Sequence, residues 1–325
     1  PEHPFWSSPE KPNEVEKRNF IVPIPGAGLI VQGDQKTGQV LVYVNNSSNW
    51  VKKKYSNFVY SSHFGFEITY LNDTYNYDGS LCPSTDGKHF IHRMYPQHIV
   101  TNDHFSASYF CPFKINENKP PVGNLDPHNR IYTNLIVKDD FHIRIHKVVA
   151  TRNFMLFEGG LALGYDSGRP QITSGPGWEY CRVGKKFSFI KNLYGFNAQL
   201  PAQGFQGNPQ GNNVLHKYSL VPALKYKGRS INEKIFASLI VANLNNRPPS
   251  QLNQLVKKFK VNKNLIYILF YDGEEVYTQI GEIRDIFLDL KGHKIGGKIL
   301  YVRAEPDGHL HLIYHDGKLI EYFKN

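Results

Sequence analysis

Apolar and polar residues alternate in short stretches along most of the chain. Clear examples are 38–46 (GQVLVYVNN), 57–70 (NFVYSSHFGFEITY), 88–95 (KHFIHRMY) and 98–110 (HIVTNDHFSASYF). Successive side chains of a strand point to opposite faces of its sheet, so a two-residue period predicts strands. Strands are expected from residue 20 onward.

Turn residues between alternating stretches predict hairpins. The stretches 130–137 (RIYTNLIV) and 141–150 (FHIRIHKVVA) are separated by three polar residues, Lys138, Asp139 and Asp140. In the last 60 or so residues the Asp-Gly pairs of YDGE, PDGH and HDGK each separate two such stretches, which is a strong hairpin signal. Gly159 and Gly160, inside a further apolar stretch, indicate a bulge or a close backbone approach.

Two segments depart from the strand pattern. The stretch 200–213 (LPAQGFQGNPQGNN) has turn residues and no period, and predicts a long loop. The stretch 248–261 (PPSQLNQLVKKFKV) begins with proline and places Leu252, Leu255, Val256 and Phe259 at helical spacing, which predicts the one helix.

Together these elements predict a mainly β chain: a large antiparallel β-sandwich, supersandwich-like, with one short helix. The sandwich is expected over residues 21–245, and the helix with a small β-meander packed on the sandwich over 246–325. The opening PEHPFWSSPEKP carries prolines at positions 1, 4, 9 and 12 and the apolar pair Phe5 and Trp6. It predicts an extended linker over residues 1–20.

The composition supports the prediction of a β fold and shows that the chain has a positive net charge. The 20 Tyr and 21 Phe, with only 2 Met, favour strands over helical bundles. The 38 Lys and Arg exceed the 28 Asp and Glu, and the net charge of +10 suits an anionic partner. A Lys- and Asn-rich genome would give the same excess, because the basic residues are spread along the chain.

Several function classes are disfavoured. No stretch approaches the roughly 18 apolar residues that cross a bilayer, so no membrane partner is expected. Nucleic acid is not expected either, because the aromatic residues follow strand periodicity and no basic cluster lies among them. GxSxG, GxGxxG and HExxH do not occur, and Cys82, Cys111 and Cys181 show no metal-ligand spacing. We therefore expect no cofactor, no metal and a cytoplasmic location, with secretion as the alternative.

The stretch FHIRIH carries the first candidate chemistry. On a strand, Phe141, Ile143 and Ile145 point to one face, and His142, Arg144 and His146 point to the other at spacings of about 7 Å. A guanidinium between two imidazoles can bind a carboxylate or sulfate. The alternative is a solvated sheet face.

The stretch YSSHFGFEI carries the second candidate chemistry. His63 shares a face with Ser61 and Gly65, while Tyr60 points to the opposite face. His63 is a candidate general base or sugar contact, or a histidine paired with a backbone carbonyl. A Tyr/His pair would serve a polysaccharide lyase, whereas a glycosidase needs two carboxylates. The candidate carboxylates are Glu67, Asp78, Asp86, Glu158 and Glu179, and their spacing selects no pair.

Four segments in order resemble the C-terminal half of proteins in domain-of-unknown-function family 2264, which is related to glycoside hydrolase family 154. They are PEHPFWSSPEKP, KYSNFVYSSHFGFEI (54–68), DGSLCPSTDGKHFIHR (78–93), and FHIRIHKV with FEGGLAL (157–163). The resemblance starts at the first residue, is strongest through Leu163 and fades beyond Tyr180. Phe141 replaces an expected Trp, and His63 an expected small residue.

The resemblance implies a β-sandwich that follows an N-terminal helical α/α toroid, in a β-glucuronidase-type glycoside hydrolase acting on uronic-acid-containing glycans. This chain alone would then be inactive, with the toroid and an acidic oligosaccharide as partners. The expected substrate-binding residues, at the rim of a shared cleft, are His142, Arg144, His146, His63, Tyr60 and Glu158; catalytic residues are not assigned. A self-contained polysaccharide lyase and a non-catalytic glycan-binding or structural module remain alternatives.

Overall fold

The computed structural model describes fifteen segments of the chain. They are residues 19–24, 29–34, 39–45, 64–70, 90–91, 94–101, 104–112, 130–138, 141–149, 154–159, 163–164, 171–206, 218–228, 233–243 and 247–323.

Within these segments the strands form two large sheets. The nine-stranded sheet holds β1 (Asn19–Ile24), β2 (Leu29–Asp34), β3 (Gln39–Asn45), β4 (Phe64–Tyr70), β5 (Phe90–Ile91), β10 (Phe154–Gly159), β11 (Leu163–Gly164), β15 (Ala198–Gln206) and β16 (Tyr218–Gly228). The eight-stranded sheet runs in the order β12 (Gln171–Gly175), β13 (Trp178–Val183), β14 (Lys186–Tyr194), β17 (Lys234–Asn243), β9 (Phe141–Val149), β8 (Arg130–Lys138), β7 (Phe105–Pro112) and β6 (Met94–Thr101). The paired strands are antiparallel except β3 and β4, which are parallel.

The C-terminal part forms two smaller sheets. One contains β18 (Val256–Asn262), β19 (Leu265–Phe270), β20 (Glu275–Gln279), β23 (Ile299–Ala304), β24 (Leu310–Tyr314) and β25 (Leu319–Tyr322), and the other pairs β21 (Ile286–Leu290) with β22 (His293–Gly297). The helix α2 (Pro249–Leu252) joins this part to β17. In the described segments no helix has the length and apolarity that a membrane crossing needs.

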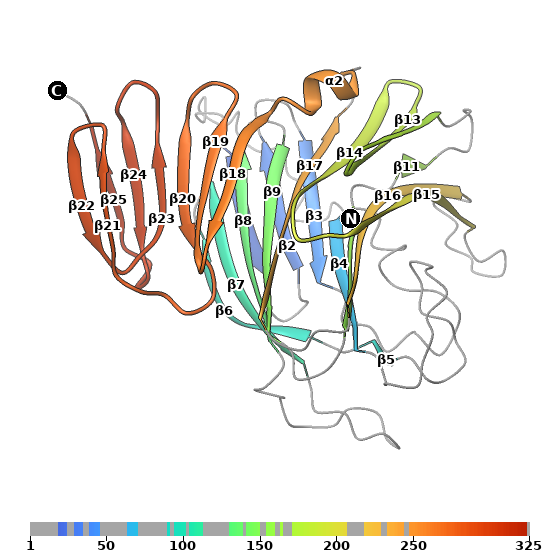
Figure 1. Cartoon of the computed structure of the whole chain (residues 1–325). Coiled ribbons are helices and arrows are strands. Elements are labelled where there is room, and N and C mark those ends of the chain that lie inside the picture. Colours follow the sequence, from blue (N-terminus) through green and yellow to red (C-terminus); the bar gives the residue numbers. More distant parts are fainter. Residues whose placement is uncertain are drawn as a thin grey trace, which may run out of the picture.

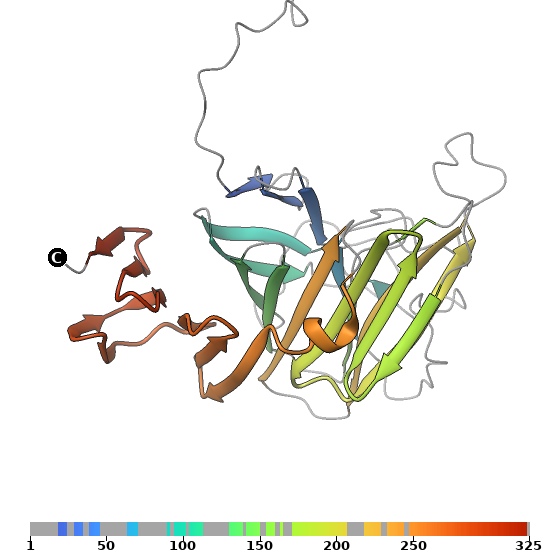
Figure 2. The same cartoon turned by 90° about the horizontal axis from the view of Figure 1, so that it is seen from above.

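Around β9 the eight-stranded sheet is a middle layer. Its Ile143 and Ile145 belong to one buried cluster with Ile268 and Phe270 of β19, and the rings of Phe141 and Phe270 lie 5.8 Å apart. The opposite face of the eight-stranded sheet packs against the nine-stranded sheet. There the rings of Phe236 on β17 and Tyr226 on β16 lie 4.9 Å apart. Figure 1 shows β18 to β20 beside β8 and β9, and Figure 2 shows the C-terminal strands extending to one side of the sandwich.

The predicted fold class is confirmed: the described chain is mostly antiparallel β-sheet in a sandwich with one short helix. The predicted hairpin between 130–137 and 141–150 is present, with Lys138 opposite Phe141. The three Asp-Gly turns connect β19 to β20, β23 to β24 and β24 to β25. Residues 1–18 lie outside the described segments, so the linker and the domain boundaries stay predictions.

Two local predictions were wrong. The helix expected over 248–261 ends at Leu252, and the chain then forms strand β18. Pairing with β19 satisfies the backbone there, and Val256 is buried while Lys257 and Lys258 are exposed. The loop expected over 200–213 is strand as far as Gln206, because β15 pairs with β16 and a bulge between Leu200 and Gln203 accommodates Pro201.

Candidate functional site

The predicted cationic row on β9 lies in the protein interior. Arg144 and His146 meet Glu158 of β10, in the facing sheet: Arg144 Nε lies 2.7 Å from Glu158 Oε1, and His146 Nε2 lies 2.5 Å from Glu158 Oε2. The side chains of these three residues are 0 % exposed, and His142 is 2 % exposed. The alternation predicted for FHIRIH is therefore present, but both faces of β9 are buried.

Hydrogen bonding fixes the orientation of His146. His146 Nε2 lies 2.5 Å from Glu158 Oε2, and its Nδ1 lies 2.9 Å from the hydroxyl of Thr133, so each ring nitrogen has a polar partner. His142, four residues before His146 on the same strand, differs. Burial, and then the nearby Arg144 guanidinium, holds the pKa of His142 well below its usual value of 6.5, so this imidazole is neutral at pH 7.

This cluster can join the two large sheets, because one carboxylate of β10 lies against a guanidinium and an imidazole of the facing sheet. In the described structure these side chains meet protein groups, and a sugar would need a route into the interior to reach them. Substrate binding by His142, Arg144, His146 and Glu158 stays a prediction. Tyr60 and His63 lie outside the described residues.

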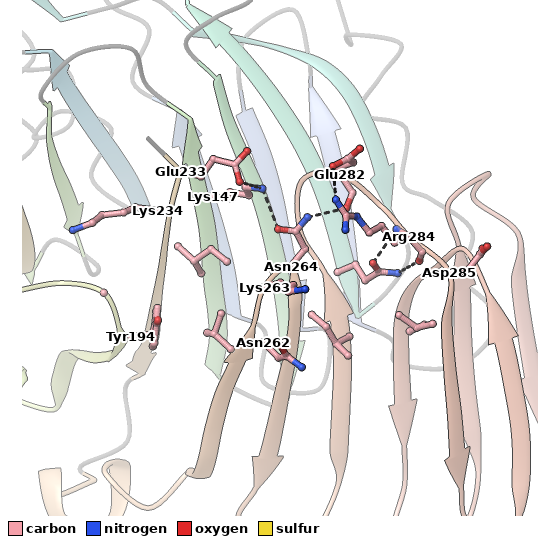
Figure 3. A pocket seen from close by; sticks show the side chains of 16 residues that line it. Lys147, Tyr194, Glu233, Lys234, Asn262, Lys263, Asn264, Glu282, Arg284 and Asp285 are labelled. Carbon is pink, nitrogen blue, oxygen red and sulfur yellow. Dashed lines mark hydrogen bonds and ion pairs between the residues drawn. The ribbon is translucent and has the colours of Figure 1, made fainter. Parts of the chain in front are cut away.

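An open groove of about 910 Å³ lies at the junction of the sandwich and the C-terminal sheet. It is lined by the ends of β9, β14 and β17 on one side, and on the other by the β18–β19 turn and the segment that joins β20 to β21. Figure 3 shows its charged and polar side chains. Volumes of a few hundred to about 1,000 Å³ are typical of small-molecule sites.

Basic and acidic groups both line the groove. The basic residues are Lys147, Lys234, Lys263 and Arg284, and the acidic ones are Glu233, Glu282 and Asp285. Lys147 Nζ lies 2.7 Å from Glu233 Oε2, and Arg284 Nη2 lies 3.2 Å from Glu282 Oε2. The phenol ring of Tyr194, 45 % exposed, adds an aromatic surface.

Two side-chain amides, of Gln279 and Asn264, hold the loop that presents Arg284. Gln279 donates through Nε2 to the carbonyl of Arg284 at 2.6 Å and accepts from the Arg284 amide at 3.0 Å. Asn264 accepts from Lys147 Nζ at 3.0 Å and donates to the carbonyl of Glu282 at 3.0 Å. The guanidinium therefore extends from a fixed backbone, although the side chain itself is 68 % exposed.

Sequence patterns did not indicate these groove residues. Lys147 and Arg284 are separated by more than 130 positions. Lys147 directly follows the FHIRIH stretch but was not among its candidate residues, and Arg284 lies in a mixed stretch, QIGEIRDIF, that matches no motif. Their proximity arises from the packing of the C-terminal sheet on the middle layer. The only signal for this site in the sequence was the overall excess of basic residues, and an overall charge does not indicate where in the chain a site lies.

Comparison with known proteins gives distant likenesses to solved structures. No protein-family model matches this chain, and no curated protein matches it. Among solved structures, a heparan sulfate lyase from Pedobacter heparinus aligns with 80 % of this chain at 11 % identity and a TM-score of 0.44. A chondroitinase AC lyase aligns with 95 % at 11 % identity and a TM-score of 0.48. A putative kojibiose phosphorylase from human microbiome aligns with 71 % at 10 % identity and a TM-score of 0.29.

The chain spans 42 % of that heparan sulfate lyase, 52 % of the chondroitinase and 31 % of the phosphorylase. Likenesses at these TM-scores carry no argument about this chain's function. Membership of family 2264 stays a prediction.

Proposed function

We propose that this chain is the β-sandwich part of a carbohydrate-active enzyme acting on uronic-acid-containing glycans, and that the groove beside Lys147 and Arg284 holds an acidic sugar. The observation that carries the proposal is the groove itself. Its basic side chains and Tyr194 surround an open space of a size that suits a short oligosaccharide.

The charges in the groove support an anionic ligand. Arg284 and Glu282 are 68 % and 75 % exposed, and an exposed ion pair contributes at most about 1 kcal/mol. A sugar carboxylate can therefore replace Glu282 as the partner of Arg284, with the two-pronged geometry that a guanidinium offers. Lys263, exposed in the β18–β19 turn, adds a second positive charge.

The finer proposal is β-glucuronidase-type hydrolysis, completed by an N-terminal helical toroid in the same protein. It rests on the family resemblance and assigns no catalytic carboxylate to the described residues. This 325-residue chain is then expected to bind acidic oligosaccharides without turning them over. A new C=C absorbance on incubation with a polyuronate would instead indicate a self-contained lyase.

Calorimetric titration of the chain with a glucuronate-containing tetrasaccharide tests the binding. We expect a neutral tetrasaccharide of the same length to bind at least about tenfold more weakly, because a charge-assisted hydrogen bond contributes about 1.5–3 kcal/mol. Arg284→Ala should weaken binding of the acidic sugar by a similar factor.

Arg182→Ala is the matched control. Arg182 lies on β13, outside the groove lining, and its Nε donates to the carbonyl of Gly184 at 2.8 Å. This variant removes the same charge and should bind within about twofold of the parent chain. Equal affinity for neutral and acidic sugars, or an unchanged affinity in Arg284→Ala, would refute the groove assignment.

A further inference from the structure

The β23–β24 hairpin brings together three side chains that can bind metal. Glu305 follows β23, His309 precedes β24 and His311 lies on β24, so both histidines share one face of the strand. The turn is closed by Glu305 N–H donating to the His309 carbonyl at 2.8 Å, and by Gly308 N–H donating to the Glu305 carbonyl at 3.0 Å. One possible ligand atom from each of the three residues lies within 4.8 Å of the others.

Part of this arrangement already has the dimensions of a metal centre. His311 Nε2 lies 3.1 Å from Glu305 Oε1. Two ligands about 2.0–2.1 Å from a tetrahedral ion are about 3.3 Å apart, so an ion can sit between these atoms after a small movement. The rings of His309 and His311 lie 4.2 Å apart, and one possible ligand atom of each lies within 4.8 Å of a Glu305 carboxylate oxygen.

The surrounding groups resemble those that orient metal ligands. His311 Nδ1 lies 3.3 Å from Glu321 Oε1 on β25, so each nitrogen of this ring faces a carboxylate oxygen. A metal-bound histidine commonly donates its other N–H to a carboxylate in this way. Arg303 Nη2 donates to the same Glu305 Oε1 and lies 3.5 Å from His311 Nε2, so this guanidinium must move aside when an ion binds between the two ligand atoms.

His309 supplies an independent observation. Its Nε2 is a buried atom, and within the described residues no hydrogen bond reaches it. The ring centroids of His311 and Phe323 lie 4.2 Å and 4.0 Å from that of His309. A buried ring nitrogen without a hydrogen bond is costly, and coordination to a metal removes that cost.

We propose that Glu305, His309 and His311 bind a divalent transition-metal ion, with Zn²⁺ as the best match. Two imidazoles and one carboxylate are a known three-ligand set for zinc, with the fourth position left for water or another ligand. The ion connects the β23–β24 turn to β24, and through Glu321 to β25. The site is separate from the groove and does not depend on the proposed glycan function.

The test is a Zn²⁺ titration of the metal-depleted 325-residue chain against a chromophoric chelator, with metal content measured by mass spectrometry. We expect one Zn²⁺ per chain in the parent protein and at least a tenfold weaker affinity in both Glu305→Gln and His309→Ala. Zn²⁺ should also raise the unfolding temperature of the parent chain and not that of His309→Ala, because a ligand that binds only the folded state stabilises it.

His315→Ala is the matched control, since His315 is exposed in the next turn of the same sheet. It should bind Zn²⁺ as the parent does. Circular dichroism verifies that each variant is folded, and Glu305→Gln keeps the side-chain shape should His309→Ala unfold. Absence of stoichiometric Zn²⁺ binding by the parent chain would overturn the proposal, and so would parent-like binding by folded Glu305→Gln and His309→Ala.

Discussion

Glu158 is a buried carboxylate between the two large sheets. Its two carboxylate oxygens lie 2.7 Å from Arg144 Nε and 2.5 Å from His146 Nε2 in the interior. Glu158→Ala leaves the Arg144 guanidinium buried without this carboxylate, and removal of one partner of a buried ion pair costs about 3–5 kcal/mol. Urea denaturation of the variant should show a loss of unfolding free energy in that range.

Glu282→Ala is the comparison, because it removes the same charge from an exposed ion pair. Its unfolding free energy should stay within about 0.5 kcal/mol of the parent value. The double variant Arg144→Met with Glu158→Leu should recover much of the lost stability, since it replaces the buried charges with apolar groups. Equal losses in Glu158→Ala and Glu282→Ala would contradict the proposed role of the interior pair.

His142 makes stability depend on pH. Its pKa is held well below 6.5 by burial and then by Arg144, so below about pH 6.5 the unfolded chain takes up a proton that the folded chain does not. Stability is therefore expected to fall as the pH decreases from 7 to 5, by up to about 1.4 kcal/mol per pH unit from this group. Denaturation curves at a series of pH values measure the slope.

Other histidines contribute to the same slope, because the pKa values of His104 and His311 are also lowered, first by burial. The informative quantity is the difference between the parent chain and His142→Gln, which should show a shallower slope below pH 6.5. His315→Gln, at an exposed turn, is the control and should keep the parent slope. An unchanged slope in His142→Gln would show that the buried imidazole is not the titrating group.

At the scale of elements, the sequence correctly predicted those hairpins that depend on neighbouring residues alone. The β8–β9 hairpin and the Asp-Gly hairpins follow from alternation and turn residues, and the structure confirms them. The residues after Leu252 follow a helical spacing, yet a strand forms because β19 supplies backbone partners. Likewise, β15 continues through Pro201 because β16 pairs with it on either side of a bulge. These outcomes depend on partner strands that local spacing does not reveal.

The candidate sites depend even more than the strands on contacts between segments that are distant in the sequence. Alternation placed His142, Arg144 and His146 on one face of β9, and that is correct. Whether that face meets solvent or another sheet depends on β10, which brings Glu158 against it. The proposed metal-binding group did not stand out in the sequence, because its histidines are spaced by one residue and their carboxylate comes from across a turn.

At the scale of the whole molecule, the C-terminal sheet completes both the core and the groove. Ile143, Ile145 and Leu239 of the middle layer share a buried cluster with Ile268 and Phe270 of β19. Asn134 of β8 donates to the hydroxyl of Thr278 at 2.9 Å and to the carbonyl of Gln279 at 2.8 Å. The six-stranded sheet is therefore expected to be part of one folding unit with the sandwich.

Truncation after residue 245 tests this expectation. It would expose the apolar face of β9 and β17, and an exposed patch of that kind favours aggregation. We expect the shortened chain to elute as aggregates in size-exclusion chromatography, to bind a hydrophobic dye, and to lose affinity for acidic oligosaccharides with the groove. Co-expression of residues 246–325 as a separate chain should restore solubility if the missing surface is the cause. A soluble, monomeric truncated chain with a cooperative unfolding transition would show instead that the sandwich folds alone and that the C-terminal sheet is a separate unit.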